Sequence, residues 1–430
     1  MPALRRLLKQ TVLLSLLFAG ALVFAAGCAG VRGSEEAARS ERLRPIDEKA
    51  TAETRALYVR LHRLDDRIMF GHQDDLAYGV NWVNEPGRSD VKATAGAYPA
   101  LYGWELGDLG REGATENLDG VNFENIKGWI KAVYDRGGVS TISWHMMNLA
   151  TDGSSWDTTR TVPEMLPGGD HHDEYKRLLD DFAAFAGDLE TDGGFLGLGG
   201  GDPIPVIFRP FHEMTGGWFW WGRGNVTPEN YKKLWRFTVD YLRDEKGVHH
   251  LLYAYSPDAQ ERMSSPEAYY RHYPGDEYVD ILAFDNYVDL QEEGASDSLA
   301  TYIRWLVDEA EARGKVPAFS EAGYEGIPDS TWWTGKLLPA LDAGEQTRQL
   351  AYVLTWRNAN KDQKEGHFFA PYPGHPSASD FRAFKQDPLM LFEDELPPMY
   401  ERLKSRSELA TYHFEVKLVA KGKAAPPASV

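Results

Sequence analysis

Short apolar segments alternate with longer amphipathic segments along most of the chain. The short segments are near-continuous hydrophobic runs, which is typical of strands buried on both faces of a parallel sheet. There are eight of them, and we predict strands at Ile68–Gln73, Ala97–Glu105, Gly138–Met146, Ile204–Glu213, His250–Ser256, Asp280–Asn286, Val316–Glu321 and Leu350–Trp356.

The segments between these strands have the spacing of helices. Apolar residues recur every three or four positions in Phe123–Arg136 and in Glu229–Lys246, and a third helix is predicted at Leu299–Ala312. Eight strand–helix repeats predict an α/β protein with a (β/α)8 TIM barrel. The alternative is an open doubly wound sheet, which would need a Gly-rich ligand loop after an early strand, and the sequence has no such loop.

The first 28 residues have the pattern of a secretory signal peptide, because three basic residues precede an apolar run from Thr11 to Ala26. The chain's single cysteine, Cys28, stands where a bacterial lipoprotein carries its lipid. We therefore expect lipidation at Cys28 and a secreted or cell-surface lipoprotein, tethered to the outer membrane if the cell is Gram-negative. Cleavage by ordinary signal peptidase is the alternative, since Ala25 replaces the usual leucine.

The remaining boundaries follow from composition. We expect a tether over residues 29–53, the catalytic barrel over 54–405 and a partly disordered C-terminal extension over 406–430.

The net charge of −19 argues against a nucleic-acid partner and suits a neutral substrate. A single cysteine excludes a disulfide framework and a cysteine metal site within one chain. No cofactor or metal is expected, and the oligomeric state stays open.

Polar and aromatic residues gather where the predicted strands end. In chain order these strand ends carry His72, Glu105, His145, Glu213, Asp258, Asp285, Glu321 and Trp356. Barrels of this class place their catalytic groups at the C-terminal ends of the strands, so we expect an active-site rim there.

Two of these residues, Glu213 and Glu321, end the fourth and seventh strands. A pair of carboxylic groups with separated pKa values can cleave a glycosidic bond, one as acid/base and the other as nucleophile. The aromatic residues that follow Glu213 would disfavour its charged form, which suits the acid. Arg209 and Tyr287 are candidates to hold Glu321 ionised.

The run from Arg209 to Gly222 closely resembles the acid/base motif of glycoside hydrolase family 26, which includes many endo-β-1,4-mannanases. The stretch Phe319–Gly323 resembles the nucleophile motif of that family, and the resemblance extends from about residue 54 to about residue 395. Further motifs that resemble strand ends of the family are Phe70–Gln73, Ser143–His145, Phe284–Tyr287 and Thr355–Asn358.

The resemblance implies double displacement, with Glu213 as acid/base and Glu321 as nucleophile. His212 and Tyr287 would position the nucleophile, His145 would contact the reacting sugar and Trp356 would form its stacking floor. The other substrate-binding residues that we expect are Trp218, Phe219, Arg209, His72 and Asp285.

The resemblance implies β-mannan, glucomannan or galactomannan as the substrate. Mixed-linkage glucan and β-1,3-xylan are alternatives within the same clan. A non-catalytic glycan-binding lipoprotein is a third hypothesis, although a binder has no need for both carboxylates. A metal-dependent deacetylase would need a His/Asp ligand set at the rim. The run His171–Glu174 is better explained as a helix start, where acidic residues suit the helix dipole.

Overall fold

The computed structural model describes residues 43–193, 200–259, 266–291 and 295–401, and its compact unit runs from Pro45 to Arg402. The predicted signal peptide, Cys28 and the C-terminal extension over 406–430 lie outside the described residues and stay predictions. Within the described ranges, no helix combines the length and the apolar character that crossing a bilayer requires.

Eight parallel strands close into a barrel, because β1 pairs with β4 on one side and with β10 on the other. All eight predicted strands are confirmed, with ends that shift by a few residues. The barrel strands are β1 (Ile68–Gln73), β4 (Leu101–Glu105), β5 (Val139–Trp144), β6 (Val206–Pro210), β7 (Leu251–Tyr255), β8 (Ile281–Asn286), β9 (Val316–Ala322) and β10 (Tyr352–Thr355).

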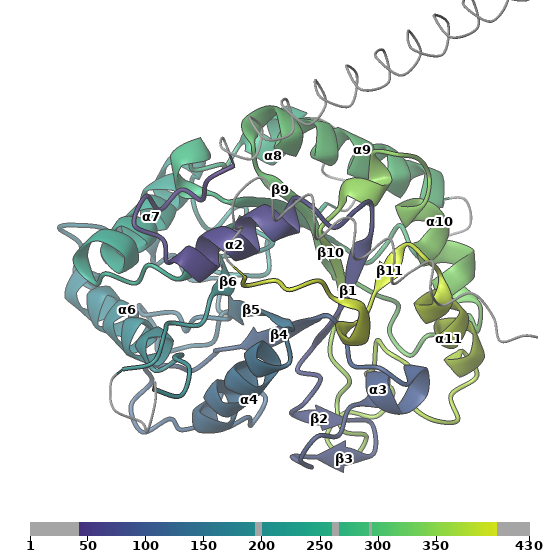
Figure 1. Cartoon of the computed structure of the whole chain (residues 1–430). Coiled ribbons are helices and arrows are strands. Elements are labelled where there is room, and N and C mark those ends of the chain that lie inside the picture. The colour runs from purple at the N-terminus through teal and green to yellow at the C-terminus, as the bar shows by residue number, and fades with distance from the viewer. Residues whose placement is uncertain (1–42, 194–199, 260–265, 292–294, 402–430) are drawn as a thin grey trace, which may run out of the picture. The chain divides into compact units, whose positions relative to one another are not determined.

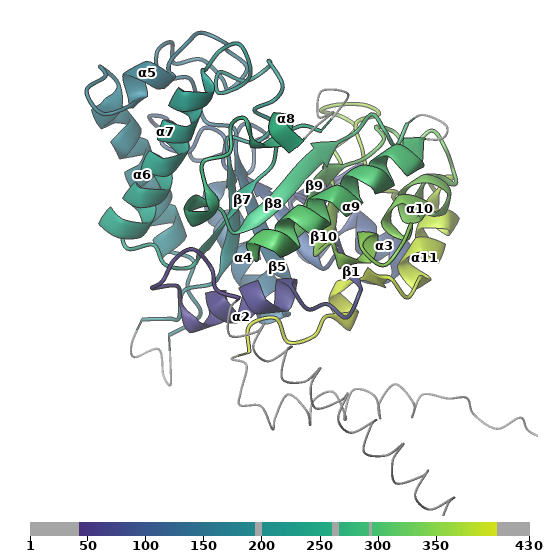
Figure 2. The ribbon, with the colours of Figure 1, turned by 90° about the horizontal axis from the view of Figure 1, so that it is seen from above.

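Helices surround the strands (Figure 1) and lie along their outer faces in the perpendicular view (Figure 2). The fold is therefore a (β/α)8 TIM barrel. The α-helices are α2 (Ala52–Leu61), α3 (Asp90–Ala95), α4 (Phe123–Asp135), α5 (Val162–Met165), α6 (His172–Gly187), α7 (Pro228–Asp240), α8 (Pro266–Tyr270), α9 (Ala295–Arg313), α10 (Leu338–Leu341) and α11 (Ala378–Gln386).

The helix ends follow the local sequence. The Asn122 side chain accepts from the Glu124 amide at 2.9 Å to cap α4, and Thr227 accepts from Asn230 at 3.2 Å to cap α7. The predicted helix Glu229–Lys246 is continued beyond α7 by a π-helical turn, Tyr241–Glu245. The run His171–Glu174 does lie at a helix start, because α6 begins at His172.

Several small elements were not predicted. The short strands β2 (Tyr78–Gly79) and β3 (Trp82–Val83) form a hairpin after β1, and β11 (Met390–Leu391) pairs beside the first residues of β1. Two-residue strands are too short to show a period in the sequence.

The compact unit begins before residue 54, so part of the segment that we expected to be a tether belongs to the barrel. Buried Asp280 explains this boundary, since its carboxylate accepts from the Ile46 amide at 2.7 Å and from the Tyr253 amide at 2.9 Å. The Thr51 side chain then caps α2 by accepting from Thr54 at 3.1 Å.

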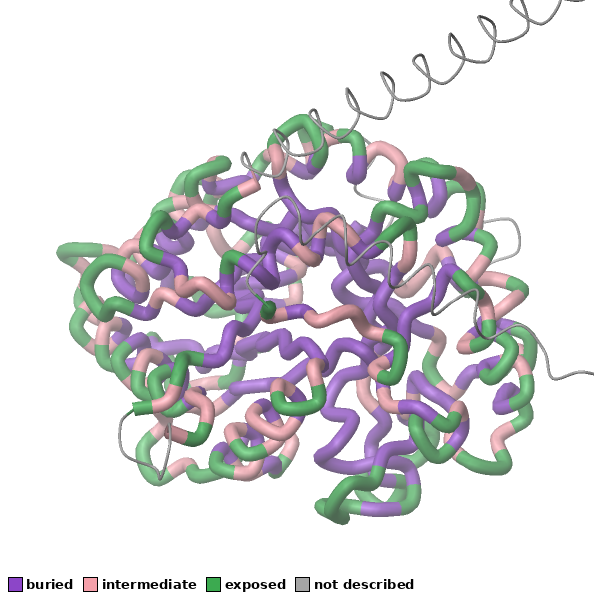
Figure 3. Tube along the Cα trace, viewed as in Figure 1, coloured by how far each residue is buried: buried purple, intermediate pink, exposed green. Residues whose placement is uncertain are grey.

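Buried residues concentrate in the strands and on the inner faces of the helices (Figure 3). Phe70 of β1 shows how the helices are held: it is fully buried and contacts the rings of Trp333, Phe381, Phe384 and Phe392 at centroid distances of 5.0–5.9 Å. This aromatic cluster joins the barrel wall to α11 and to the last segment of the unit.

Phe70→Ala should lower the free energy of unfolding by about 3–5 kcal/mol, because it removes a large buried ring and leaves a cavity. Urea denaturation would measure the change. Val83→Ala is the control, since Val83 is 51% exposed and its loss should stay within about 0.5 kcal/mol. An equal effect of the two substitutions would contradict this account of the core.

Candidate active site

A cleft of about 380 Å³ opens at the C-terminal ends of the strands. Its walls come from the segments that follow β5, β6, β8, β9 and β10, which is the rim that the sequence predicts. The lining residues are His145, Trp156, His212, Glu213, Trp218, Phe219, Tyr287, Gln291, Glu321, Glu325, Trp356 and Phe369.

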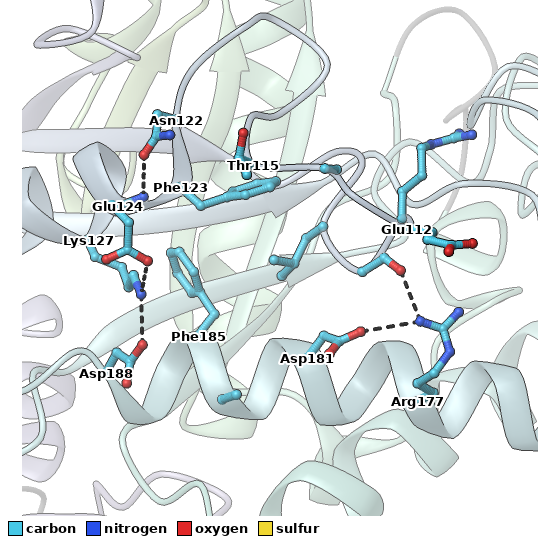
Figure 4. A pocket seen from close by; sticks show the side chains of 15 residues that line it. Glu112, Thr115, Asn122, Phe123, Glu124, Lys127, Arg177, Asp181, Phe185 and Asp188 are labelled. Carbon is cyan, nitrogen blue, oxygen red and sulfur yellow. Dashed lines mark hydrogen bonds and ion pairs between the residues drawn. The ribbon is translucent and has the colours of Figure 1, made fainter.

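A second and larger groove, about 550 Å³, lies on the outside of the barrel beside α4 and α6 (Figure 4). Most of its charged groups already have partners. Lys127 Nζ lies 2.7 Å from Asp188 and also contacts Glu124, while Arg177 donates to the Gly110 carbonyl at 3.0 Å. We therefore take the cleft at the strand ends as the candidate site.

A buried arginine organises the floor of this cleft. Arg209, at the end of β6, donates to Asp285 at 2.9 Å and to Ser256 at 3.0 Å, and its other terminal nitrogen contacts Glu321 Oε1. Tyr287 donates to the second Glu321 oxygen at 2.7 Å. Both oxygens of Glu321 are therefore held in place by donors.

Strand β9 carries a register shift where Glu321 lies. Phe284 pairs with Phe319, but the next residue of β8, Asp285, pairs with Glu321, so Ser320 is an extra residue in β9. A bulge of this kind re-aims the side chains that follow it. The Ser320 hydroxyl donates to Asp285 Oδ1 at 2.6 Å and so binds the bulge to the arginine cluster.

Glu213 lies in a strained turn after β6. Its φ is +54° and that of Phe211 is +49°, which is uncommon backbone for residues other than glycine. The Glu213 amide donates to the Ser256 carbonyl at 2.8 Å, and the Trp221 indole donates to the His212 carbonyl at 2.7 Å. These bonds hold a conformation that is found most often at functional sites.

The Glu213 carboxylate accepts a hydrogen bond from the Trp218 indole at 2.8 Å, whereas Glu321 is paired with a guanidinium. Burial raises the pKa of Glu213 well above its ordinary value, and the negative charges of Glu321 and Asp285 raise it further. Glu213 therefore holds its proton more tightly than an ordinary glutamate, as a general acid must.

Oxygens of Glu213, Glu321 and Asp285 all lie within 4.8 Å of one another. Three carboxylates this close resemble a metal site, but Arg209 already supplies a cation to two of them. An oxygen of Glu213 within 4.8 Å of an oxygen of Glu321 is compatible with the separation of about 5–5.5 Å that allows one carboxylate to attack a sugar while the other transfers the proton.

The chain matches the family model described as glycosyl hydrolase family 26 over residues 46–329. The chain belongs to this family. Among solved structures, a family 26 β-mannanase from Bacteroides ovatus is 41% identical with a TM-score of 0.76, and the match covers 83% of this chain and 99% of that one. An endo-β-1,4-mannanase from Cellulomonas fimi is 36% identical with a TM-score of 0.75, over 84% of this chain and 80% of that one.

A curated relative, mannan endo-1,4-β-mannosidase from Bifidobacterium adolescentis, is 35% identical over 359 residues. That match covers 79% of this chain but only 34% of the relative, so the family 26 chain spans about a third of that protein's length.

The buried ring of His145 lines the cleft of this family 26 barrel and is paired with a carboxylate. Glu105, from the neighbouring strand β4, accepts from the His145 ring at 2.7 Å and from its amide at 2.7 Å. Burial alone would lower the pKa of His145, but the charge of Glu105 outweighs it and raises that pKa. His212 differs, since burial and the nearby Arg209 lower its pKa well below the ordinary value.

The structure brings most of the predicted site residues into the cleft but places three behind it. Arg209 and Asp285 are buried under Glu321, where they would act on the sugar only through that carboxylate. The His72 ring is buried at the end of β1 and pairs with Asp75 at 2.8 Å, and it is not among the residues that line the cleft.

Four further lining residues were not predicted: Trp156, Gln291, Glu325 and Phe369. All four lie on loops. Trp156 is 50% exposed and stacks on His145 at 5.1 Å, and a tryptophan within a polar segment after a strand end is a signal that could have revealed it. Gln291 and Glu325 give no comparable signal in the sequence.

Glu105→Gln should lower the pKa of His145, because burial then acts without the compensating negative charge. A pH titration of the His145 ring signals by NMR would measure the shift. The control is Glu124→Gln, on the surface of α4, which should leave the His145 titration where it is. An unchanged His145 titration in Glu105→Gln would rule out this pairing.

Proposed function

We propose that this chain is a retaining endo-β-1,4-mannanase that hydrolyses mannan, glucomannan or galactomannan by double displacement. One observation carries the proposal: oxygens of Glu213 and Glu321 lie within 4.8 Å of each other in the cleft, in opposite electrostatic environments. This arrangement supplies a proton donor and a nucleophile across one glycosidic bond.

In the first step, Glu321 attacks the anomeric carbon while Glu213 gives its proton to the leaving oxygen. The glycosyl ester that forms removes the negative charge of Glu321. That charge is one of the causes that raise the pKa of Glu213, so the pKa of Glu213 should fall in the intermediate. Glu213 is then suited to act as the base that takes a proton from the attacking water.

The choice of mannan rests on the relatives, whose names state endo-1,4-β-mannosidase or β-mannanase activity. The cleft itself offers aromatic surfaces from Trp156, Trp218 and Trp356, which suit the flat faces of pyranose rings in general. A glucanase or xylanase of the same clan is therefore the alternative that a substrate test must separate.

The purified protein should release short manno-oligosaccharides from galactomannan and glucomannan, with much lower rates on mixed-linkage glucan and β-1,3-xylan. Glu213→Ala should lose about 10²–10⁴-fold in turnover, the usual size of a general acid–base contribution. Glu321→Ala should lose several orders of magnitude. Product analysis across the polysaccharide panel measures the substrate preference, and the rate of product release measures the turnover of each variant. Turnover by Glu321→Ala at the wild-type rate would contradict the proposed mechanism.

Activity should fall on the alkaline side as Glu213 loses the proton that it must donate. The Trp218 indole stabilises the charged carboxylate of Glu213, so Trp218→Phe should raise the pKa of Glu213. The alkaline limb of the pH–activity profile should then move to higher pH. The pH profile of kcat/KM reports this free-enzyme pKa. Trp156→Phe is the matched control, because its indole also lines the cleft but has no bond to Glu213. A limb that stays in place in Trp218→Phe would argue against Glu213 as the acid.

A further inference from the structure

The two sides of the cleft differ in chemistry. Beside Glu213 the wall is aromatic, with Trp156, Trp218 and Phe219. On the Glu321 side the carboxylate of Glu325 enters the lining together with the rings of Tyr287 and Phe369. The Glu325 side chain is 56% exposed, and an exposed glutamate is normally mobile in solvent.

Glu325 is held in place by a buried histidine. Nδ1 of His367 lies 2.5 Å from Oε1 of Glu325, and the His367 side chain is only 10% exposed. The His367 ring also packs edge-on against Phe369, with centroids 5.3 Å apart. The buried His367 ring fixes the Glu325 carboxylate at the edge of the cleft. Glu325 therefore loses less side-chain conformational entropy when a ligand binds to it.

The loop that carries His367 is itself pinned. Buried Asn358 accepts from the amides of Phe369 and Ala370 at 2.9 Å, and the Gly326 amide donates to the Phe368 carbonyl at 2.8 Å. The segments after β9 and β10 are therefore joined both by backbone and by the Glu325–His367 pair.

This rigid wall reaches the reacting carboxylate. Phe369 packs against Tyr287 at 5.8 Å, and Tyr287 donates to Glu321. Gly323 permits this packing, because a Cβ at that position would lie 2.4 Å from the Phe369 ring. The position of Glu325 is thus fixed relative to Glu321 by a continuous set of contacts.

We propose that Glu325 is a sugar-binding residue on the Glu321 side of the cleft and that His367 positions it. One oxygen of Glu325 is engaged by His367. Within the described part of the chain the other oxygen has no protein partner, so it is available to accept from the hydroxyl groups of a sugar unit. This inference rests on the proposed glycanase activity, since the ligand is a neutral β-linked oligosaccharide whose reacting unit lies at Glu321.

A hydrogen bond to a charged acceptor is stronger than one between neutral groups, and its loss corresponds to about a 10- to 100-fold loss of affinity. Because Glu325 contacts no reacting atom, the loss should be the same in the ground state and in the transition state. Such uniform binding raises KM and leaves kcat nearly unchanged.

The test compares Glu325→Ala, Glu325→Gln, His367→Ala and His367→Asn with the wild type, using manno-oligosaccharides of three to six units. Glu325→Ala should raise KM at least about 10-fold with kcat within about two-fold, and Glu325→Gln should lose less because its amide keeps one acceptor. His367→Asn should retain most of the affinity, since an asparagine amide can replace the ring N–H, whereas His367→Ala should resemble Glu325→Ala. The double variant Glu325→Ala/His367→Ala should lose no more than Glu325→Ala alone.

Glu365→Ala is the matched control, because Glu365 is an exposed glutamate on the same loop and does not line the cleft. An unchanged KM in Glu325→Ala, in an active wild type, would overturn the inference and leave the proposed function standing. A fall in kcat with a lowered Tm would also overturn it, because the pair would then only join two loops. A wild type that hydrolyses no β-mannan would instead overturn the proposed function.

Discussion

Burial of the Arg209 guanidinium is the constraint on which the site depends. Its side chain is 3% exposed, and a buried cation is tolerated only when opposite charges and hydrogen bonds replace its lost hydration. Asp285 and Glu321 supply those charges from two neighbouring strands. Loss of Arg209 would leave two buried carboxylates without a counter-charge, so the packing at the end of the barrel and the position of the proposed nucleophile depend on the same side chain.

This cluster also separates the two glutamates. Glu321 has a guanidinium on one oxygen and a phenol on the other, whereas the Glu213 carboxylate accepts from one donor among the described residues, the Trp218 indole N–H. Burial and the nearby carboxylates of Glu321 and Asp285 raise the pKa of Glu213, so a proton on Glu213 is stabilised. The same arginine that pairs with Glu321 therefore leaves Glu213 as the carboxylic group suited to hold a proton.

The sequence predicted the features that repeat along the chain or that are concentrated in one short segment. The eight strands were visible because each is an apolar run of several residues, and Glu213 was visible because an aromatic run follows it. The Glu105–His145 pair and the Ser320 bulge were not, since they depend on the register between strands, which no single segment encodes. Trp156 and Glu325 lie on loops, whose path is set by tertiary contacts such as those of Asn358.

The asymmetry of the cleft fits the order of events in double displacement. An aromatic side chain can stack on a sugar ring whatever the orientation of the hydroxyl groups. A fixed carboxylate accepts a hydrogen bond only from a hydroxyl group at a suitable distance and angle. In the proposed mechanism, the sugar bonded to Glu321 must stay bound through both steps, and His367 fixes the Glu325 carboxylate at the edge of the same cleft. The sugar that leaves in the first step would meet the aromatic side chains beside Glu213, such as Trp218 and Phe219. The directional acceptor would then act on the sugar that is held longer, and the less directional contacts on the sugar that is released first.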